Sequence, residues 1–238
     1  GTSASTVSTP TFSPSSGNYT STQNVSISTT TAGASIYYTT NGDAPTTSST
    51  LYTGAVPVSS TTTIKAIAVL SGMSDSPVAS ATLTFPTNVA DIAALRAATT
   101  PGFYKLTGEA ILTFKSATRN SKYIQDASGA VLIDDNGGVI TTAYNVGDGI
   151  TGIAGTTAFY NGMLQFTPVV DPGVATSTNN TVSPVVITPD QLINNQGKLV
   201  KVQTVSIAGS GNFAASTSYV LNGNSSTVLR TQYADLNY

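Results

Sequence analysis

Residues 61–70 of the chain read TTTIKAIAVL, and this stretch indicates the fold class. Ile64, Ala66, Ala68 and Leu70 alternate with Thr63, Lys65, Ile67 and Val69. Strict alternation places successive side chains on opposite faces of a β-strand. The stretch VSIS at residues 25–28 repeats the pattern on a smaller scale. We therefore predict that the chain is all-β.

Seven short strands are expected in the first part of the chain. They lie near residues 10–13, 23–29, 34–40, 50–53, 55–58, 62–70 and 77–85. Asn41-Gly42 follows one of these strands, and Asn-Gly is a strong hairpin signal because both residues tolerate a positive φ. Residues 1–85 hold 38 of the 69 Ser and Thr residues, which alone would suit a disordered stalk, but the alternation argues against one. Seven strands in about 80 residues indicate a fibronectin-like or immunoglobulin-like sandwich, which we place at residues 1–86.

The same region carries a family resemblance at about residues 10–85. The matching pieces are Phe12-Ser13-Pro14, Gly17-x-Tyr19, Ile36-Tyr37-Tyr38-Thr39, Asn41-Gly42, Pro45-Thr46, Leu51-Tyr52 and Ile64-Lys65-Ala66. In these pieces the chain resembles the chitobiase/β-hexosaminidase C-terminal domain family. The resemblance implies a fibronectin-like accessory module that is found beside enzymes and in cell-surface proteins and is not itself catalytic.

A change of pattern at Pro86 opens a second region, which we place at residues 87–175. Residues 87–98 predict a helix with Asn88 as its N-cap, and a long strand with Gly108 in its middle follows at 103–114. Further strands are expected at 123–126, 130–133, 148–153 and 163–166, the last two as a pair around Asn161-Gly162.

Five strands, the first long and kinked, fit an OB-like barrel. The stretches KYIQDASGAVLIDD (122–135), VGDGITGIAG (146–155) and YNGMLQF (160–166) resemble the OB-fold domains of secreted bacterial proteins.

Residues 176–238 repeat part of this second region. A helix start with Pro189 at its first position precedes a strand at 199–205, and two more strands follow at 219–221 and 228–230. We predict a partial second OB-like segment. Two alternatives remain open: the second barrel continues beyond Tyr238, or the segment packs onto the first barrel.

Composition excludes several kinds of catalysis. The chain has no His and no Cys, and Glu109 is its single Glu. Ser-His-Asp and Cys-His catalysis, His or Cys metal sites and disulfides are therefore ruled out. We expect no cofactor, no metal and no enzymatic activity.

Two candidate binding sites emerge. A basic cluster consists of Lys105, Lys115, Arg119 and Lys122, and the aromatic Tyr123 follows directly after it. On an OB fold, basic and aromatic side chains of this kind could bind an oligonucleotide. The alternative is a solvated strand edge, which the net charge of −2 favours.

In the first region Tyr37, Tyr38 and Tyr52 are candidates for a sugar-binding platform. The alternative is that these tyrosines pack in the core and in turns.

These observations favour a non-catalytic secreted or cell-surface protein that acts as an adhesion or ligand-display module. The alternative is an accessory part of a larger secreted enzyme, with a glycan or a nucleic acid as its target. We expect a bacterial, extracellular or cell-surface location, with the signal or anchor segment absent from this chain. No membrane span is expected, because the longest apolar runs are only a few residues long. The expected partner is a glycan or a surface protein rather than a nucleic acid.

Overall fold

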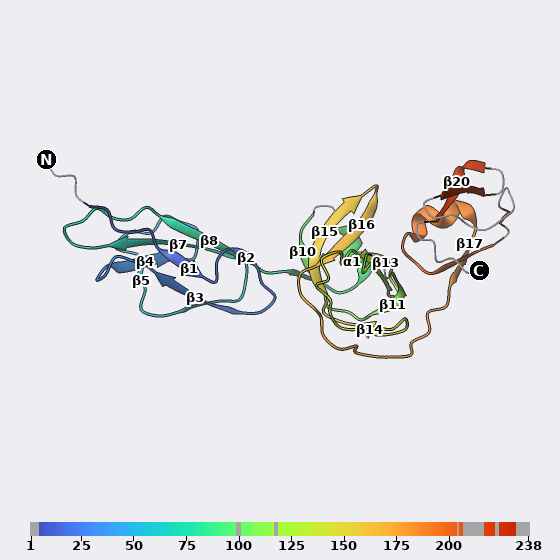
Figure 1. Cartoon of the computed structure of the whole chain (residues 1–238), viewed down its shortest axis with the longest axis horizontal. Helices are drawn as coiled ribbons and strands as arrows, with labels where there is room; N and C mark the ends of the chain where they lie inside the picture. Colours follow the sequence, from blue (N-terminus) through green and yellow to red (C-terminus); the bar gives the residue numbers. More distant parts are fainter. Residues whose placement is uncertain are drawn as a thin grey trace. The chain divides into compact units, whose positions relative to one another are not determined.

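The computed structural model describes residues 5–98, 101–116, 119–203, 205–206, 217–221 and 224–231, with side chains up to residue 206 (Figure 1). The chain divides into two compact units. The first comprises Gly1–Asn88, Gly102–Lys105 and Ala154–Thr156, and the second Val89–Pro101, Leu106–Ile153 and Thr157–Tyr238. The three-part division predicted at residues 86 and 175 stays a prediction.

The first unit contains two antiparallel-rich sheets that form a β-sandwich, as the alternation predicts. One sheet has the order β1-β3-β6 and the other β2-β8-β7-β4-β5. The strands are β1 (Thr11–Ser13), β2 (Gly17–Asn18), β3 (Gln23–Ser28), β4 (Ser35–Thr39), β5 (Thr50–Leu51), β6 (Val56–Val58), β7 (Thr62–Val69) and β8 (Ala79–Thr84). All seven expected strands are present. Strand β2, which pairs with β8 over only two residues, was not predicted from the sequence.

The sandwich core consists of the inward positions of both sheets. Ile64, Ala66 and Ala68 of β7 are fully buried, and Val25 and Ile27 of β3 belong to the same apolar cluster. Side chains from both sheets thus share one core, because every second residue of each strand points inward.

The Asn41-Gly42 pair does not form the tight hairpin that we expected. Gly42 has a positive φ of 83°, but β4 and β5 are joined by the loop 40–49 rather than by two residues. The side chain of Asn41 instead accepts a hydrogen bond from Asp43 N at 3.1 Å, so the pair makes a local turn inside a longer connection.

The barrel region is built on one eight-stranded sheet with the order β14-β11-β12-β13-β16-β15-β10-β9. Its strands are β9 (Thr87–Val89), β10 (Phe103–Leu106), β11 (Ala110–Lys115), β12 (Lys122–Gln125), β13 (Ala130–Ile133), β14 (Gly149–Ile150), β15 (Ala154–Tyr160) and β16 (Met163–Pro168). The pairing of β13 with β16 is parallel, whereas β11 with β12 and β12 with β13 are antiparallel.

The sheet curls because β10 and β11 lie near its opposite ends and yet only residues 107–109 separate them along the chain. Gly108 lies at this interruption, and a Cβ there would overlap the carbonyl oxygen of Ala90. The predicted long strand with a central glycine is therefore two strands that together bring the ends of the sheet toward each other.

The interruption changes which side chains face inward. Strict alternation along the predicted strand 103–114 would place Tyr104, Leu106, Leu112 and Phe114 on one face. Instead Phe103 and Leu106, three positions apart on β10, are both buried, whereas Tyr104 is partly exposed. Phe114 is 42% exposed, because the register shifts between Leu112 and Phe114. A single residue of shift moves a side chain to the other face.

The helix is shorter than predicted. Helix α1 spans Ile92–Ala97, and its N-cap is Asp91 rather than Asn88. Residues 87–89 form β9, since Val89 O accepts a hydrogen bond from Thr107 N at 2.9 Å. Asp91 accepts from Ala94 N at 2.8 Å, which satisfies a donor that the first helical turn would leave open.

The strand pair around Asn161-Gly162 also needs a correction. Both residues have positive φ, 49° and 76°, as a two-residue hairpin turn requires. The partner of β16 across this turn is β15, not the stretch 148–153, of which only Gly149–Ile150 is a strand.

The C-terminal part repeats the start of the barrel. It contains β17 (Val185–Ile187), the 3-10 helix η1 (Pro189–Asn195), β18 (Val200–Val202), β19 (Thr217–Leu221) and β20 (Asn224–Thr231). Ile187 O accepts from Gln203 N at 2.9 Å, just as Val89 O accepts from Thr107 N. The strand–helix–strand arrangement of β9, α1 and β10 thus occurs again in β17, η1 and β18.

Candidate functional site

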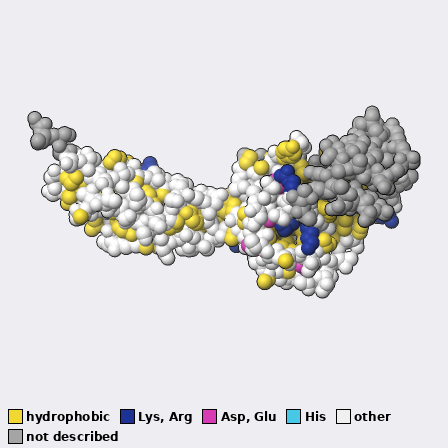
Figure 2. Space-filling model, in the orientation of Figure 1, with side chains coloured by type: hydrophobic (Ala, Val, Ile, Leu, Met, Phe, Trp, Pro, Cys, Tyr) yellow, Lys and Arg dark blue, Asp and Glu magenta, His cyan; other side chains and the backbone are white. Residues whose placement is uncertain are grey.

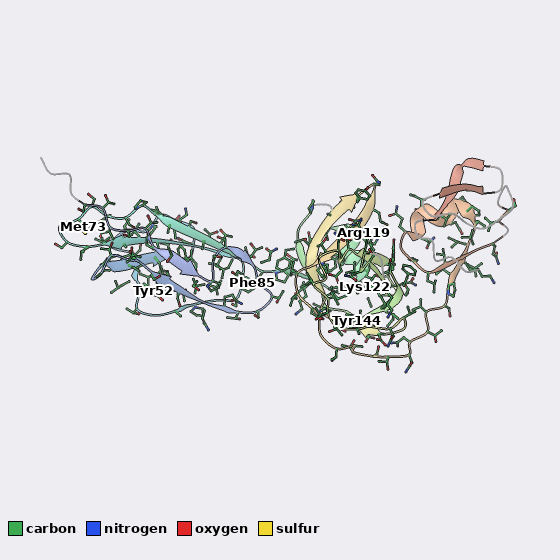
Figure 3. All side chains as sticks on the ribbon, viewed as in Figure 1. Tyr52, Met73, Phe85, Arg119, Lys122 and Tyr144 are labelled. Atoms are coloured by element: carbon green, nitrogen blue, oxygen red, sulfur yellow. The ribbon has the colours of Figure 1, made fainter. Side chains whose placement is uncertain are left out.

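The predicted basic cluster lies mainly on the hairpin formed by β11 and β12. Lys115 of β11 pairs directly with Lys122 of β12, and Arg119 lies in the connection between the strands. Lys105 lies on β10, whose neighbours in the sheet are β15 and β9. Figure 3 labels Arg119 and Lys122. Three of the four cations are therefore close along one hairpin, and the fourth lies on a different strand pair.

Lys122 forms an ion pair that is almost closed to solvent. Its Nζ lies 3.0 Å from Asp135 Oδ2, and the two side chains are 12% and 0% exposed. Asp135 Oδ1 also accepts a hydrogen bond from Val139 N at 2.7 Å. Asp135 thereby ties the loop after β13 to the hairpin, and the charge of Lys122 is neutralised within the protein.

The other two cations of the hairpin also have partners. Arg119 Nη2 lies 3.5 Å from Asp134 Oδ1 in an exposed ion pair. Lys115 Nζ donates to the backbone oxygen of Tyr144 at 2.6 Å. Carboxylates next to Arg119 and Lys122 lower the local positive potential, so this hairpin offers less attraction to a polyanion than its three basic residues suggest.

The aromatic residues of the hairpin form a pair of their own. Phe114 and Tyr123 are cross-strand partners whose rings meet edge to face, with centroids 6.1 Å apart. Successive residues of a strand point to opposite faces, so this ring pair and the Lys115–Lys122 pair lie on opposite faces of the hairpin. The structure brings Tyr123 close to Phe114 rather than into one groove with the lysines.

The three candidate tyrosines of the sandwich do not form one surface. The rings of Tyr38 and Tyr52 meet edge to face with centroids 6.3 Å apart, and both rings pack against the core. Tyr37 precedes Tyr38 on β4 and points to the other face, where its strand partners are Leu51 and Ile67. Tyr37 is therefore the only one of the three on the outer face of the five-stranded sheet.

Charged side chains gather on the second unit. Figure 2 shows Lys and Arg side chains over this unit on the face in view, whereas the first unit has a largely uncharged surface there. Residues 1–85 contain only Asp43, Lys65 and Asp75 as charged residues. The ionic chemistry of the protein is thus concentrated in the barrel unit.

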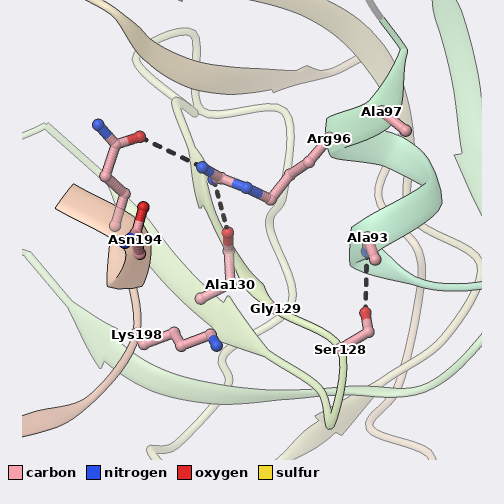
Figure 4. Close-up of a pocket in the computed structure, with 9 residues that line it drawn as sticks. Ala93, Arg96, Ala97, Ser128, Gly129, Ala130, Asn194 and Lys198 are labelled. Atoms are coloured by element: carbon pink, nitrogen blue, oxygen red, sulfur yellow. Dashed lines mark hydrogen bonds between the residues drawn. The ribbon is translucent and has the colours of Figure 1, made fainter. Parts of the chain in front are cut away.

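A hollow of about 300 Å³ in the second unit was not anticipated from the sequence. It is lined by α1, by the turn between β12 and β13, and by residues 194–198 (Figure 4). Two cations, Arg96 and Lys198, are among its lining residues. They stand about 100 positions apart, so no local pattern links them.

Asp171 lies in the segment after β16 and connects it by hydrogen bonds to residues 141–142. Its Oδ2 accepts hydrogen bonds from Thr141 N at 2.8 Å and Thr142 N at 2.7 Å, and its Oδ1 accepts from Gly173 N at 2.9 Å. Burial alone would raise the pKa of Asp171, but these N–H groups and the threonine hydroxyls hold that pKa far below its ordinary value.

Glu109 holds the same segment through a hydrogen bond at a second point. Thr176 Oγ1 donates to Glu109 Oε1 at 2.6 Å, and hydroxyls of Thr176 and Ser177 lower the pKa of this carboxyl. Tyr144 donates its hydroxyl to Gly173 O, and burial together with the nearby Asp171 raises the pKa of the phenol. These carboxylates stay ionised and bind the protein's own donors.

Within the described ranges, no three or more Asp or Glu side chains lie close enough together to hold a metal ion. Among the helices of those ranges, none has the length and apolar character to cross a membrane.

Comparison with known protein families finds a match in the sandwich. Residues 14–80 match the family model of the chitobiase/beta-hexosaminidase C-terminal domain. The recognition of this domain from its sequence pieces is thus confirmed for the first unit, whereas the resemblance of the barrel to OB-fold domains stays a prediction. No curated protein matches the chain. No solved structure matches it either.

Proposed function

We propose that this chain is a non-catalytic, extracellular part of a bacterial secreted or cell-surface protein, and that it serves adhesion or the display of a ligand-binding surface. The observation that carries the proposal is the match of residues 14–80 to a domain family named for the C-terminal part of chitobiase and β-hexosaminidase. The sandwich formed by these residues places its apolar side chains in the core and Ser and Thr on its surface, as suits an accessory module.

The lowered pKa values of two carboxylates, Asp171 and Glu109, support a non-catalytic role. A general acid at neutral pH needs a raised pKa. Asp171 and Glu109 have lowered pKa values, and both bind backbone or hydroxyl groups of a neighbouring segment. Their role is to hold that segment in place.

One observation favours a second function, that of an accessory glycan-binding part of a larger secreted enzyme. Tyr37 lies on the outer face of the five-stranded sheet between Leu51, which is 48% exposed, and Ile67. An aromatic ring flanked by aliphatic side chains can stack on the apolar face of a sugar ring.

The two functions are separated by a retention experiment. The chain is applied to insoluble chitin, cellulose and peptidoglycan and, in parallel, to an array of host surface proteins. Chito-oligosaccharide hydrolysis is followed by the release of reducing ends. Adhesion predicts retention on the protein array by wild type and by Tyr37→Ala alike, with no hydrolysis.

Two other outcomes of this experiment would contradict the adhesion proposal. Retention on a polysaccharide that is lost in Tyr37→Ala but kept in Tyr38→Phe would favour the accessory glycan-binding role instead. Turnover of the oligosaccharide would overturn the non-catalytic proposal altogether.

A further inference from the structure

The hollow at residues 93–97, 128–130 and 194–198 carries an excess of positive charge. Among the residues that the structure describes, its lining includes Arg96 and Lys198 and no carboxylate. Within the described part of the chain, neither cation forms an ion pair with Asp or Glu. This differs from the β11–β12 hairpin, where Lys122 and Arg119 each have a carboxylate partner.

The guanidinium of Arg96 is held in place by the protein. Nη1 donates to Ala130 O at 3.1 Å, a bond that Figure 4 shows. Nη2 donates to Gln196 Oε1 at 3.2 Å. A neutral carbonyl and a neutral amide leave the positive charge uncompensated while they fix the plane of the group. A guanidinium fixed in this way is pre-organised for an oxyanion, which it binds through parallel N–H groups.

The remaining lining groups are suited to the same kind of ligand. Gln196 uses its carbonyl oxygen toward Arg96, so its amide NH₂ is a donor, and Asn194 supplies a second amide. Ser128 is committed to the barrel, because its hydroxyl accepts from Ala93 N at 2.8 Å and donates to Asp126 Oδ1 at 2.6 Å. The apolar part of the lining consists of alanine methyl groups rather than rings, which disfavours a flat apolar ligand.

From these observations we infer that the hollow between Arg96 and Lys198 binds a small oxyanion, a carboxylate or a phosphate carried on a hydroxylated compound about the size of a monosaccharide. The volume of about 300 Å³ is at the lower end of ligand pockets. Arg96 and Lys198 bind the anionic group, and the amides of Asn194 and Gln196 donate to it or to neighbouring hydroxyls. This site is separate from the outer face of the sandwich, and the inference does not depend on the proposed function.

Binding at this hollow has a structural consequence. Arg96 belongs to α1 and Lys198 follows η1, and the segment after η1 is already bonded to α1 through Arg96 and Gln196 and to β12 through Leu199 N, which donates to Gln125 Oε1 at 2.8 Å. A ligand in contact with both cations adds a bridge between α1 and residues 189–202. Ligand binding should therefore slow amide hydrogen exchange in β17, η1 and β18.

The test titrates the full chain with galacturonate, glucose 6-phosphate and inorganic phosphate, with glucose as the neutral control, by isothermal calorimetry at low salt. The variants are Lys198→Gln and, as a matched loss of charge outside the hollow, Lys201→Gln on β18. Arg96→Lys is a second pocket variant, which keeps the charge and loses the planar fork.

We expect saturable binding of galacturonate or of glucose 6-phosphate, and the one that binds identifies the oxyanion as a carboxylate or a phosphate. Lys198→Gln should weaken binding about tenfold and Arg96→Lys at least as much, whereas Lys201→Gln should change it less than twofold. Slower exchange in residues 185–203 should accompany binding.

Three results would overturn the inference. One is the absence of saturable binding of all three anions by wild type. Another is equal weakening by Lys198→Gln and Lys201→Gln, which would indicate a general attraction of anions. The third is binding of glucose as tight as that of the anions.

Discussion

The sandwich and the barrel are stabilised by different chemistry, although both are β-sheet structures. In the sandwich, buried polar bonding is done by neutral groups: Ser76 Oγ accepts from Ala68 N at 2.9 Å inside the unit. In the barrel, carboxylates accept from backbone N–H groups, as Asp126 does from Ile92 N at 2.8 Å and Asp135 from Val139 N at 2.7 Å.

This difference follows from the connections. The connections between strands of the sandwich are at most ten residues long, and the longest is the loop 40–49. The barrel has longer segments at 134–148 and 169–184, whose backbone donors need a strong acceptor fixed elsewhere in the fold. Hydrogen bonds to a charged acceptor are stronger than neutral ones, and they make stability depend on pH. The comparison therefore predicts that mutations and acid act unequally on the two units.

The largest effect is expected from Asp135→Asn. The free energy of unfolding of the second unit should fall by about 3–5 kcal/mol, because the nearly buried ammonium of Lys122 loses its counter-charge. Urea unfolding followed by backbone amide NMR signals reads the two units separately. The neighbouring variant Asp134→Asn, which breaks only the exposed pair with Arg119, is the control and should cost about 1 kcal/mol or less. Equal effects of the two variants would show that the Asp135–Lys122 pair has no special role.

In the sandwich the largest effect should come from an apolar truncation. Leu83→Ala removes a fully buried side chain of β8, and the free energy of unfolding of the first unit should fall by about 3 kcal/mol. Leu51→Ala, at a side chain that is 48% exposed, should lose about 0.5 kcal/mol or less. The same NMR-detected urea titration measures both. If Leu83→Ala destabilised the second unit instead, the division of the core between the units would be wrong.

Glycine-to-alanine substitutions in the two units should differ in their effect on stability. Gly108→Ala should destabilise the second unit by about 2 kcal/mol, because the new methyl group would overlap the carbonyl oxygen of Ala90 and push the backbone at residues 90 and 108 apart. Gly54→Ala in the sandwich is the matched control, since nothing lies within 4 Å of a Cβ there. Thermal unfolding by calorimetry gives both values. A neutral Gly108→Ala would mean that the bend between β10 and β11 tolerates a side chain.

Acid should affect the barrel more than the sandwich. The folded-state pKa of Asp171 lies below its unfolded value near 3.8, so its stabilisation is complete above about pH 4 and is lost as the pH falls through the folded pKa. Asp171→Asn should lower the free energy of unfolding of the second unit at neutral pH and have a smaller effect under acid. Asp43→Asn, in a sandwich loop, is the control and should change little at any pH. Urea titrations between pH 7 and pH 2 test this, and parallel acid profiles of wild type and Asp171→Asn would contradict it.

The smallest expected effect is on nucleic-acid binding. Arg119 and Lys122 are paired with carboxylates and the chain has a net charge of −2, so labelled single-stranded DNA or RNA should show no change in fluorescence anisotropy at moderate salt. Micromolar affinity that falls steeply with salt and is lost in Arg119→Ala, but kept in Lys65→Ala on the sandwich, would make the hairpin a nucleic-acid-binding surface.

The sequence by itself determined the elements that depend on local patterns. Alternation at 61–70 placed Ile64, Ala66 and Ala68 in a core, and the turn residues Asn161-Gly162 marked a hairpin that the structure contains. The reason is that side-chain direction in a strand repeats every two residues and needs no distant partner. Where a pattern also depended on a bulge, as at Phe114, the local rule predicted the wrong face.

The tertiary structure alone decided which distant residues meet. No spacing rule places Arg96 beside Gln196, 100 positions later, or buries Asp135 against Lys122. These contacts arise when the sheet curls and the C-terminal segment comes to lie on β13 and α1. Their partners are set by the path of the whole chain, and the energy of a buried charge depends on what surrounds it rather than on its neighbours in sequence.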